Sequence, residues 1–176
     1  MEAARLAKIT GKPVQVVWDR SEEFFFDAFR PAAVVKIRAG LTSAGKIAFW
    51  DFAVVGAGDR NAATFYDVPH SRTTSAGGWM GGNPAGMHPF DVGAWRAPSV
   101  NTNTFARESH IDMLANKAGV DPLQFRLNNL SDKRMIRVLQ AAAEKFGWKP
   151  GKTPSGRRPG ALVRLRYRSI FKRRLF

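Results

Sequence analysis

The sequence predicts an α+β fold in which an antiparallel strand hairpin and one further strand pack with several helices. Two runs rich in apolar residues, 32–41 and 46–55, are separated by turn-forming residues, as in a hairpin. A shorter Val-rich run, 13–18, alternates as a strand does. Helical periodicity follows between residues 101 and 146, with capping residues between its segments.

The chain before residue 30 is predicted to hold a short helix, a strand and a second helix. The first helix covers 3–9, and the strand is the run PVQVVW at 13–18. Asp19 caps the second helix, with Glu22 as its capping-box partner. The aromatic run 24–26 (FFF) cannot turn all of its rings toward one core, so we expect part of it to meet another surface.

The hairpin is predicted from its turn and from its alternation. Residues 42–45 (TSAG) are turn material between the two strands. In the first strand, Lys36 and Arg38 lie on the face opposite Val35 and Ile37, as the period of two requires. One face of the hairpin is therefore expected to be apolar and to pack on the core.

A long irregular segment is predicted between the hairpin and the helices. Residues 56–93 are rich in Gly, Pro, Asn and Asp, and loops of this length are usually functional or disordered. The segment ends in Gly93–Pro98 (GAWRAP), just before a helix. One Arg and exposed backbone N–H groups at a helix start can bind an anionic group.

Three helices are predicted in the last third of the chain. The first begins near Asn103, and the second begins after Asp121, an N-cap, with Pro122 at its first position. The third covers 132–146 and stops at Gly147. Its apolar face is formed by Met135, Val138, Leu139, Ala142 and Phe146.

Composition excludes several classes of site. The chain has no Cys, which excludes disulfides and cysteine-ligated zinc or iron–sulfur sites within it. His70, His88 and His110 lack metal-ligand spacing, so no metal site is expected. No apolar run approaches a membrane span, and 1–13 lacks the apolar segment of a signal peptide.

The positive charge is concentrated at one end of the chain. Residues 151–176 hold nine of the 28 Lys and Arg residues and none of the 14 Asp and Glu residues, and so contribute +9 of the net +14. We interpret 156–176 as a basic tail unrelated to the rest, as a shift of reading frame near Gly156 would produce. A tail of this kind also binds polyanions non-specifically.

Three stretches, in order along the chain, resemble one enzyme family. They are FRPA at 29–32, GAWRAPSVNTNTFARESHIDML at 93–114, and DPLQFRLNNL at 121–130, which fits the pattern DPxxFRLxNL. Together they resemble the large, molybdenum-binding subunit of the xanthine dehydrogenase and aldehyde oxidase family, in the branch of the isoquinoline 1-oxidoreductase beta subunit. The resemblance extends over 2–155, which we interpret as part of a larger molybdopterin-binding domain.

The resemblance implies a function and a site. Enzymes of this family insert oxygen from water into a C–H bond of an aldehyde or an N-heteroaromatic compound. Molybdenum sits on a pterin dithiolene, and electrons leave through iron–sulfur centres in another subunit or domain. By resemblance, Gly93, Ala94, Trp95 and Arg96 form the loop that binds the molybdenum cofactor, with Arg96 beside an anionic group. Relatives of this kind are cytoplasmic, some periplasmic, and we expect the cytoplasm.

The resemblance leaves the substrate open. Pro98 takes the substrate-pocket position where many relatives have an aromatic residue, and Ser99 takes a position where they commonly have Gly. Without the resemblance, the simplest interpretation of Arg96 is an ion pair with a carboxylate such as Asp91.

Two acids on the first long helix invite a catalytic interpretation. Glu108 and Asp112 are four residues apart and share one helix face, as a general acid/base pair could. We instead expect them to make hydrogen bonds that position neighbouring backbone. By resemblance, the general-base Glu and a Gly-rich cofactor loop lie outside this chain. We therefore expect the chain alone neither to retain molybdopterin nor to turn over.

An alternative function rests on the basic tail. Tyr167 and Phe171 lie among arginines and could stack on bases, as in a protein that binds nucleic acid or an anionic membrane surface. No nucleic-acid-binding motif accompanies the tail, and the well-patterned residues lie elsewhere.

Overall fold

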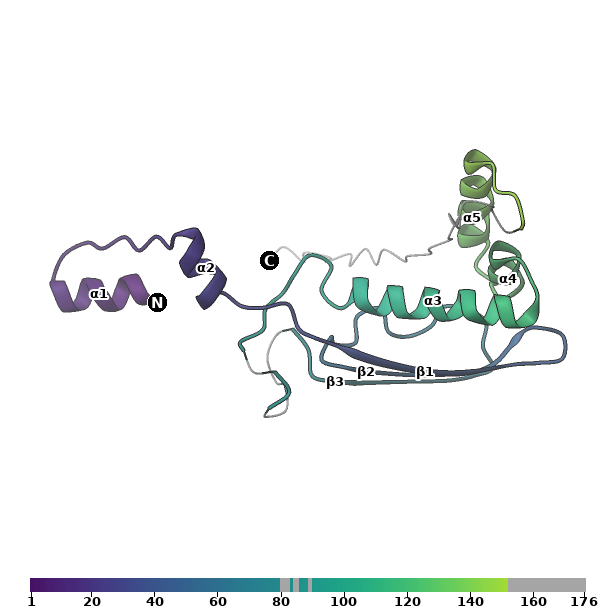
Figure 1. The fold of residues 1–176 in the computed structure, drawn as a ribbon, viewed down its shortest axis with the longest axis horizontal. Coiled ribbons are helices and arrows are strands. Elements are labelled where there is room, and N and C mark those ends of the chain that lie inside the picture. Colours follow the sequence, from purple (N-terminus) through teal and green to yellow (C-terminus); the bar gives the residue numbers. More distant parts are fainter. Residues whose placement is uncertain (80–82, 84–85, 89, 152–176) are drawn as a thin grey trace, which may run out of the picture.

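The computed structural model describes residues 1–79, 83, 86–88 and 90–151, and the fold is α+β as predicted (Figure 1). The basic tail predicted at 156–176 lies outside the described residues. In chain order, the elements are α1 (Glu2–Thr10), α2 (Arg20–Phe26), β1 (Val34–Leu41), β2 (Ile47–Val55), β3 (His70–Ala76), α3 (Val100–Ala118), α4 (Pro122–Asn128) and α5 (Lys133–Phe146).

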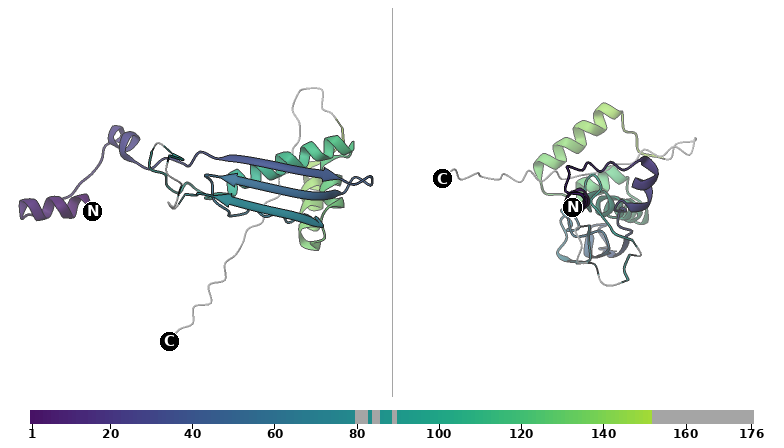
Figure 2. Two further views of the ribbon diagram at one scale, coloured as in Figure 1. Left: turned by 90° about the horizontal axis from the view of Figure 1, so that it is seen from below. Right: turned by 90° about the vertical axis from the view of Figure 1, so that its left-hand side faces the viewer.

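The sheet has the strand order β1-β2-β3 and is mixed. The predicted hairpin is confirmed: β1 and β2 are antiparallel, with Val34 opposite Val55. β3 runs parallel to β2, with His70 opposite Phe49. Figure 2 shows the three strands side by side, with α3 behind them.

The third strand is not the one predicted from sequence. Residues 13–18 form no strand, because no described residue pairs with them and most of their side chains face solvent. The strand β3 instead lies inside the segment 56–93, which was predicted to be irregular throughout. Its residues HSRTTSA are all exposed, so no apolar alternation marks it, and backbone pairing with β2 supplies its order.

The core lies between one face of the sheet and α3. From Trp50 on, β2 alternates as its period requires, burying Trp50, Phe52 and Val54, and Ile47 is buried beyond a register shift at the start of the strand. These side chains pack with Ile111, Leu114 and Ala115 of α3 and Phe125 of α4. Burying side chains of this size contributes about 1.5–3 kcal/mol each. The buried cluster thus fixes α3, and with it the loop that precedes α3, against the sheet.

The helix ends follow the predicted chemistry. Asp121 Oδ1 accepts hydrogen bonds from the backbone N–H of Leu123 (3.0 Å) and Gln124 (3.1 Å) at the start of α4. α5 ends at Gly147, whose φ of 67° is the left-handed conformation of a C-cap. The apolar face predicted for α5 is only partly used. Met135 and Leu139 are buried, but Val138 and Phe146 are exposed because α5 packs mainly on α4.

The first 28 residues form an arm that extends away from the sheet (Figure 1). Neither α1 nor α2 buries a residue. The predicted capping box is present, with Asp19 accepting from the Glu22 N–H and Glu22 accepting from the Asp19 N–H, both at 2.9 Å. Among the helices that the structure describes, none is long and apolar enough to cross a bilayer.

Candidate functional site

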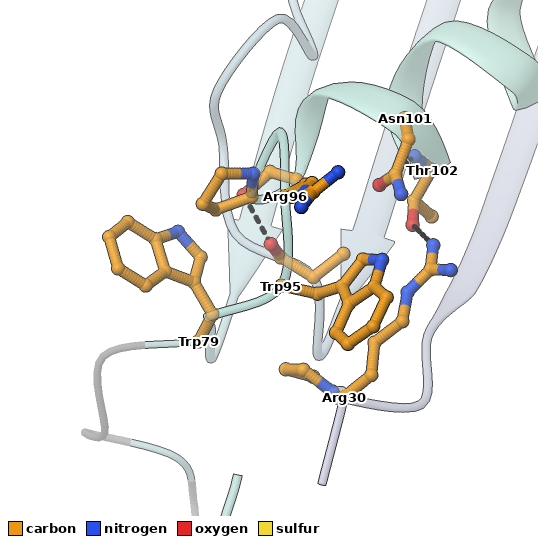
Figure 3. A pocket seen from close by; sticks show the side chains of 10 residues that line it. Arg30, Trp79, Trp95, Arg96, Asn101 and Thr102 are labelled. Atoms are coloured by element: carbon orange, nitrogen blue, oxygen red, sulfur yellow. Dashed lines mark hydrogen bonds between the residues drawn. The ribbon is translucent and has the colours of Figure 1, made fainter. Parts of the chain in front are cut away.

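Three segments far apart in the sequence meet at the start of α3. They are residues 28–32 before β1, residues 56–60 after β2, and residues 91–102, which contain the GAWRAP loop. Figure 3 shows side chains from these segments gathered around a small pocket, with Trp79 on another side.

Backbone pairing holds the first segment against the third. The Phe29 N–H donates to the Asp91 carbonyl at 2.8 Å, and the Gly93 N–H donates to the Phe29 carbonyl at 2.9 Å. Gly93 is required here, because a Cβ at this position would lie 2.7 Å from Ala28 Cβ. The two segments therefore lie in close contact, and this contact places Arg30 beside the GAWRAP loop.

The second segment is fixed on two sides. Gly56 has φ of 89°, and a Cβ there would lie 2.2 Å from the Ala32 carbonyl oxygen, so only glycine fits. From the other side, Asn103 Nδ2 donates to the carbonyls of Gly58 and Arg60, each at 3.0 Å. The buried first turns of α3 thus set the position of the pocket wall at Ala57.

The loop that enters α3 is strained. Ala97 and Ser99 have φ of 54° and 63°, a region that residues with a side chain rarely occupy. Ser99 Oγ donates to the Ala57 carbonyl, and this buried contact helps to hold the conformation. Strain of this kind persists where surrounding structure over-determines it, and it is concentrated at functional sites.

The pocket is small and carries positive charge. Its volume is about 20 Å³, which is room for about one water molecule. Its lining is formed by Arg30, Pro31, Ala57, Trp79, Trp95, Arg96, Pro98, Ser99, Asn101 and Thr102. Two guanidinium groups and no carboxylate are in this set. A pocket with this lining suits a compact anionic group.

The two arginines are not neutralised by the residues that the structure describes. Arg30 Nη2 donates to Thr102 Oγ1 at 3.2 Å, a neutral partner. Arg96 makes no ion pair within the described part of the chain, so the alternative pairing with Asp91 is not seen there.

The predicted site residues divide into two groups. Trp95, Arg96 and Pro98 line the pocket, whereas Gly93 and Ala94 do not. Gly93 acts through its backbone contact with Phe29. Sequence reasoning missed Arg30 and Thr102 as pocket residues. The FRPA stretch was a signal for Arg30, but only the tertiary structure brings it to the loop.

Glu108 and Asp112 belong to a buried polar network rather than to the pocket. Glu108 accepts from Tyr66 Oη (2.9 Å), from Arg107 Nε (3.0 Å) and from Arg126 Nε (3.1 Å). Arg126 also donates to Asp112 at 2.6 Å. These bonds join α3, α4 and the segment after β2. Within the described residues, both carboxylates bond to side chains rather than to the neighbouring backbone that we expected, because buried arginines occupy the carboxylate oxygens. Burial and the charge of Glu108 raise the pKa of Tyr66.

The histidines form no metal site in the described residues. In that part of the chain, no three His, Cys, Asp or Glu side chains lie together in a way that could hold a metal ion. The ring of His110 packs edge-on against Trp50, with 5.4 Å between ring centroids. Burial lowers the pKa of His110, so the ring is held neutral in the core.

Comparison with known proteins identifies relatives of the whole described fold. The model of the molybdopterin cofactor-binding domain matches residues 1–130. A nicotinate dehydrogenase subunit of Pseudomonas putida is 32% identical, over 87% of this chain and 14% of its own length. The aldehyde oxidoreductase molybdenum-binding subunit PaoC of Escherichia coli is 30% identical, over 88% and 24%. The isoquinoline 1-oxidoreductase beta subunit of Brevundimonas diminuta is 27% identical, over 89% and 22%.

Solved structures share the fold at lower identity. Quinoline 2-oxidoreductase from Pseudomonas putida 86 has a TM-score of 0.67 at 15% identity, and CO dehydrogenase from Oligotropha carboxidovorans has 0.68 at 18%. Each match covers 83% of this chain and 22% of the other. The chain therefore spans about a seventh to a quarter of the length of these relatives and structural neighbours. The alternative of a polyanion-binding protein gains no support from these matches.

Proposed function

This chain belongs to the molybdopterin cofactor-binding domain family, whose model matches 1–130 of its 176 residues, and from that premise we propose that its GAWRAP loop faces the molybdenum cofactor of an oxidoreductase. The observation that carries the proposal is Arg96, a cation without a carboxylate partner among the described residues, on a strained loop at a pocket. The relatives are named as oxidoreductase or dehydrogenase subunits, which supports an enzymatic role for a family-length protein.

The pocket fits part of the cofactor. An oxo-molybdenum dithiolene and a pterin phosphate are both anionic. Arg30 and Arg96 supply two cations, and the pocket lining has no carboxylate that would repel an anion. A volume of about 20 Å³ admits one anionic group rather than a whole pterin. Trp95 and Arg96 would therefore hold an edge of the cofactor, with Pro98 on the substrate side. Segments of a family-length subunit outside this chain would bind the remainder.

The proposed reaction is hydroxylation of an aldehyde or an N-heteroaromatic compound, with water as the oxygen source. The names of the relatives support this range of substrates, since they include a nicotinate, an aldehyde and an isoquinoline enzyme. The bound cofactor would supply the redox chemistry, and an iron–sulfur subunit or domain would carry the electrons away. The residues of this chain would bind and orient the cofactor.

A chimera tests the cofactor role directly. Residues 1–130 would replace the matching segment of the Pseudomonas putida nicotinate dehydrogenase subunit, and molybdenum content and turnover would be measured. We expect Arg96→Gln to lower both about tenfold or more, the effect of losing one charge-assisted hydrogen bond. Arg5→Gln is the control, because it removes one positive charge from an exposed position on α1, outside the pocket. Full molybdenum content and turnover in the Arg96→Gln chimera would refute the proposal.

We also propose that this chain alone is inactive. A site assembled from distant segments cannot be completed by one of them, and the general-base Glu is expected outside this chain. Expression in a host that makes molybdopterin, followed by a molybdenum assay, should give far less than one metal per chain. A stoichiometric metal content would contradict this expectation.

A further inference from the structure

We propose that Arg30, together with Arg96, forms a two-cation site for a tetrahedral oxyanion, and that Thr102 orients Arg30. The inference deepens the proposed function and rests on it for the identity of the physiological ligand. It assigns a binding role to a residue 66 positions before Arg96 in the sequence, which the motif of the loop does not contain.

The position of Arg30 is fixed by the fold. Its neighbour Phe29 makes two backbone hydrogen bonds with the chain at 91–93, at 2.8 and 2.9 Å. The Phe29 and Phe90 rings also pack together, with 5.0 Å between centroids. On the other side, Ala32 lies against Gly56, which has no room for a side chain. Arg30 is therefore held on both flanks, and Figure 3 shows its guanidinium beside Thr102 and close to Trp95.

The charge environment of Arg30 and Arg96 differs from that of the four arginines that belong to the two carboxylate clusters of the fold. Arg38 and Arg72 share Asp51, and the buried Arg107 and Arg126 share Glu108. In contrast, neither Arg30 nor Arg96 pairs with a carboxylate in the described part of the chain, although both line one pocket. Both arginines are exposed, so solvent screens their mutual repulsion in part, and an anion bound between two like charges that line one pocket would offset the remainder.

The lining indicates the chemical class of the anion. Thr102 and Asn101 add neutral polar groups at the first turn of α3, while Trp79, Trp95 and Pro98 add apolar walls. The space holds little more than one water molecule, so it takes one oxygen of an anion, whose other oxygens lie at the pocket mouth near the polar groups of the lining. Phosphate and an oxo-molybdenum group share this chemistry, and each is a source for the same site.

The test uses NMR of the full chain with labelled arginine side chains. Molybdate and phosphate would be titrated separately at constant ionic strength, with chloride as the control anion. We expect saturable shifts of the Arg30 and Arg96 Nε–H signals. These signals are local to the pocket, so binding of anions by the basic residues at 151–176 is recorded separately.

Variants distinguish the two-cation site from general attraction of anions. Arg30→Gln and Arg96→Gln should each weaken binding about tenfold or more, whereas Arg5→Gln on α1 should leave it unchanged. Thr102→Val should weaken binding less, and Thr102→Ser should restore it, because only the hydroxyl orients Arg30. The fold of each variant would be checked by its amide spectrum.

Each outcome decides the inference. Equal weakening by all three arginine variants, or weakening by Arg96→Gln alone, would overturn the role of Arg30. Weakening by Arg96→Gln alone would leave the proposed function of Arg96 intact. No saturable shift with either anion would overturn the two-cation site, and the molybdenum content of the chimera would then decide the proposed function independently. Binding of phosphate alone or molybdate alone supports the site and assigns its source.

Discussion

At the scale of single residues, Glu108 is the polar centre of the fold. It is 2% exposed, and its two oxygens accept from Tyr66 and from two arginines on α3 and α4. Arg107 and Arg126 are fully buried, and Glu108 supplies the counter-charge of Arg107 and shares that of Arg126 with Asp112. A buried ion pair adds little net stability, because both charges lose their hydration. Removing one partner is costly, because it leaves the other charge buried without a counter-charge.

We expect Glu108→Gln to lower the free energy of unfolding by about 3–5 kcal/mol, because the buried Arg107 loses its counter-charge and the buried Arg126 keeps only Asp112. Urea unfolding followed by circular dichroism measures the change. Asp112→Asn is the matched control. Its carboxylate is partly exposed and pairs with Arg126, which keeps Glu108 as a second partner, so we expect a loss below about 1 kcal/mol. Equal losses in the two variants would contradict the central role of Glu108.

Ser99 combines backbone strain with a useful side chain. Ser99→Ala keeps φ in the left-handed region and removes the bond to the Ala57 carbonyl, so we expect a loss of about 1–3 kcal/mol. Ser99→Gly removes the same bond but relieves the backbone, and should be about 1 kcal/mol more stable than the alanine variant. Chemical unfolding of both variants checks the order. An alanine variant as stable as the glycine variant would show that the backbone is not strained.

At the scale of elements, one carboxylate joins all three strands. Asp51 of β2 accepts from Arg38 of β1 at 2.6 Å and from Arg72 of β3 at 2.9 Å. Arg72, and then Arg38, lowers the pKa of Asp51 to about 2. This cluster lies on the sheet face opposite α3, where it links β3, a strand without apolar anchors, to the hairpin.

The Asp51 cluster should make stability depend on pH. The folded-state pKa of about 2 is below the ordinary 3.8, so its contribution is complete above about pH 4 and is lost as the pH falls toward 2. In that range, Asp51→Asn should show a smaller change of unfolding free energy with pH than the wild type. Asp27→Asn, on the arm, is the control and should keep the wild-type slope. Identical slopes for Asp51→Asn and wild type would contradict the assignment.

At the scale of the whole molecule, the described chain has a packed body and an uncovered arm. The phenyl rings of Phe24, Phe25 and Phe26 are 72%, 81% and 71% exposed. As expected, Phe24 and Phe25 do not both face the core, and contact of the run with another surface stays a prediction. Among the described strands, β3 lies at an edge of the sheet, a position that can pair with another strand. Both features favour self-association of the isolated chain.

Phe25→Ser should separate association from stability. We expect the unfolding free energy to change by less than about 0.5 kcal/mol, because the ring has few contacts to lose. Sedimentation velocity should show less self-association than in the wild type. By contrast, Phe52→Ala in the core should cost about 3–5 kcal/mol. A stability loss of that size in Phe25→Ser would show that the arm packs on the body.

The sequence by itself determined the parts of this protein that depend on neighbouring residues. The turn at 42–45, the cap at Asp121 and the stop at Gly147 act within a few residues, and each is found where its pattern predicts. The three family motifs likewise identified the cofactor class, and the family match confirms it.

Only the tertiary structure decided which strand completes the sheet and which residues share the pocket. β3 has no apolar pattern and gains its order from β2, while the Val-rich run at 13–18 has no partner and stays irregular. Arg30 and Arg96 lie 66 residues apart, and their meeting depends on the backbone bonds of Phe29 and on a position without a side chain at Gly93. The physical reason is the same in both cases. Pairing between distant backbones leaves little trace in local hydrophobicity, because its hydrogen bonds involve groups that every residue carries.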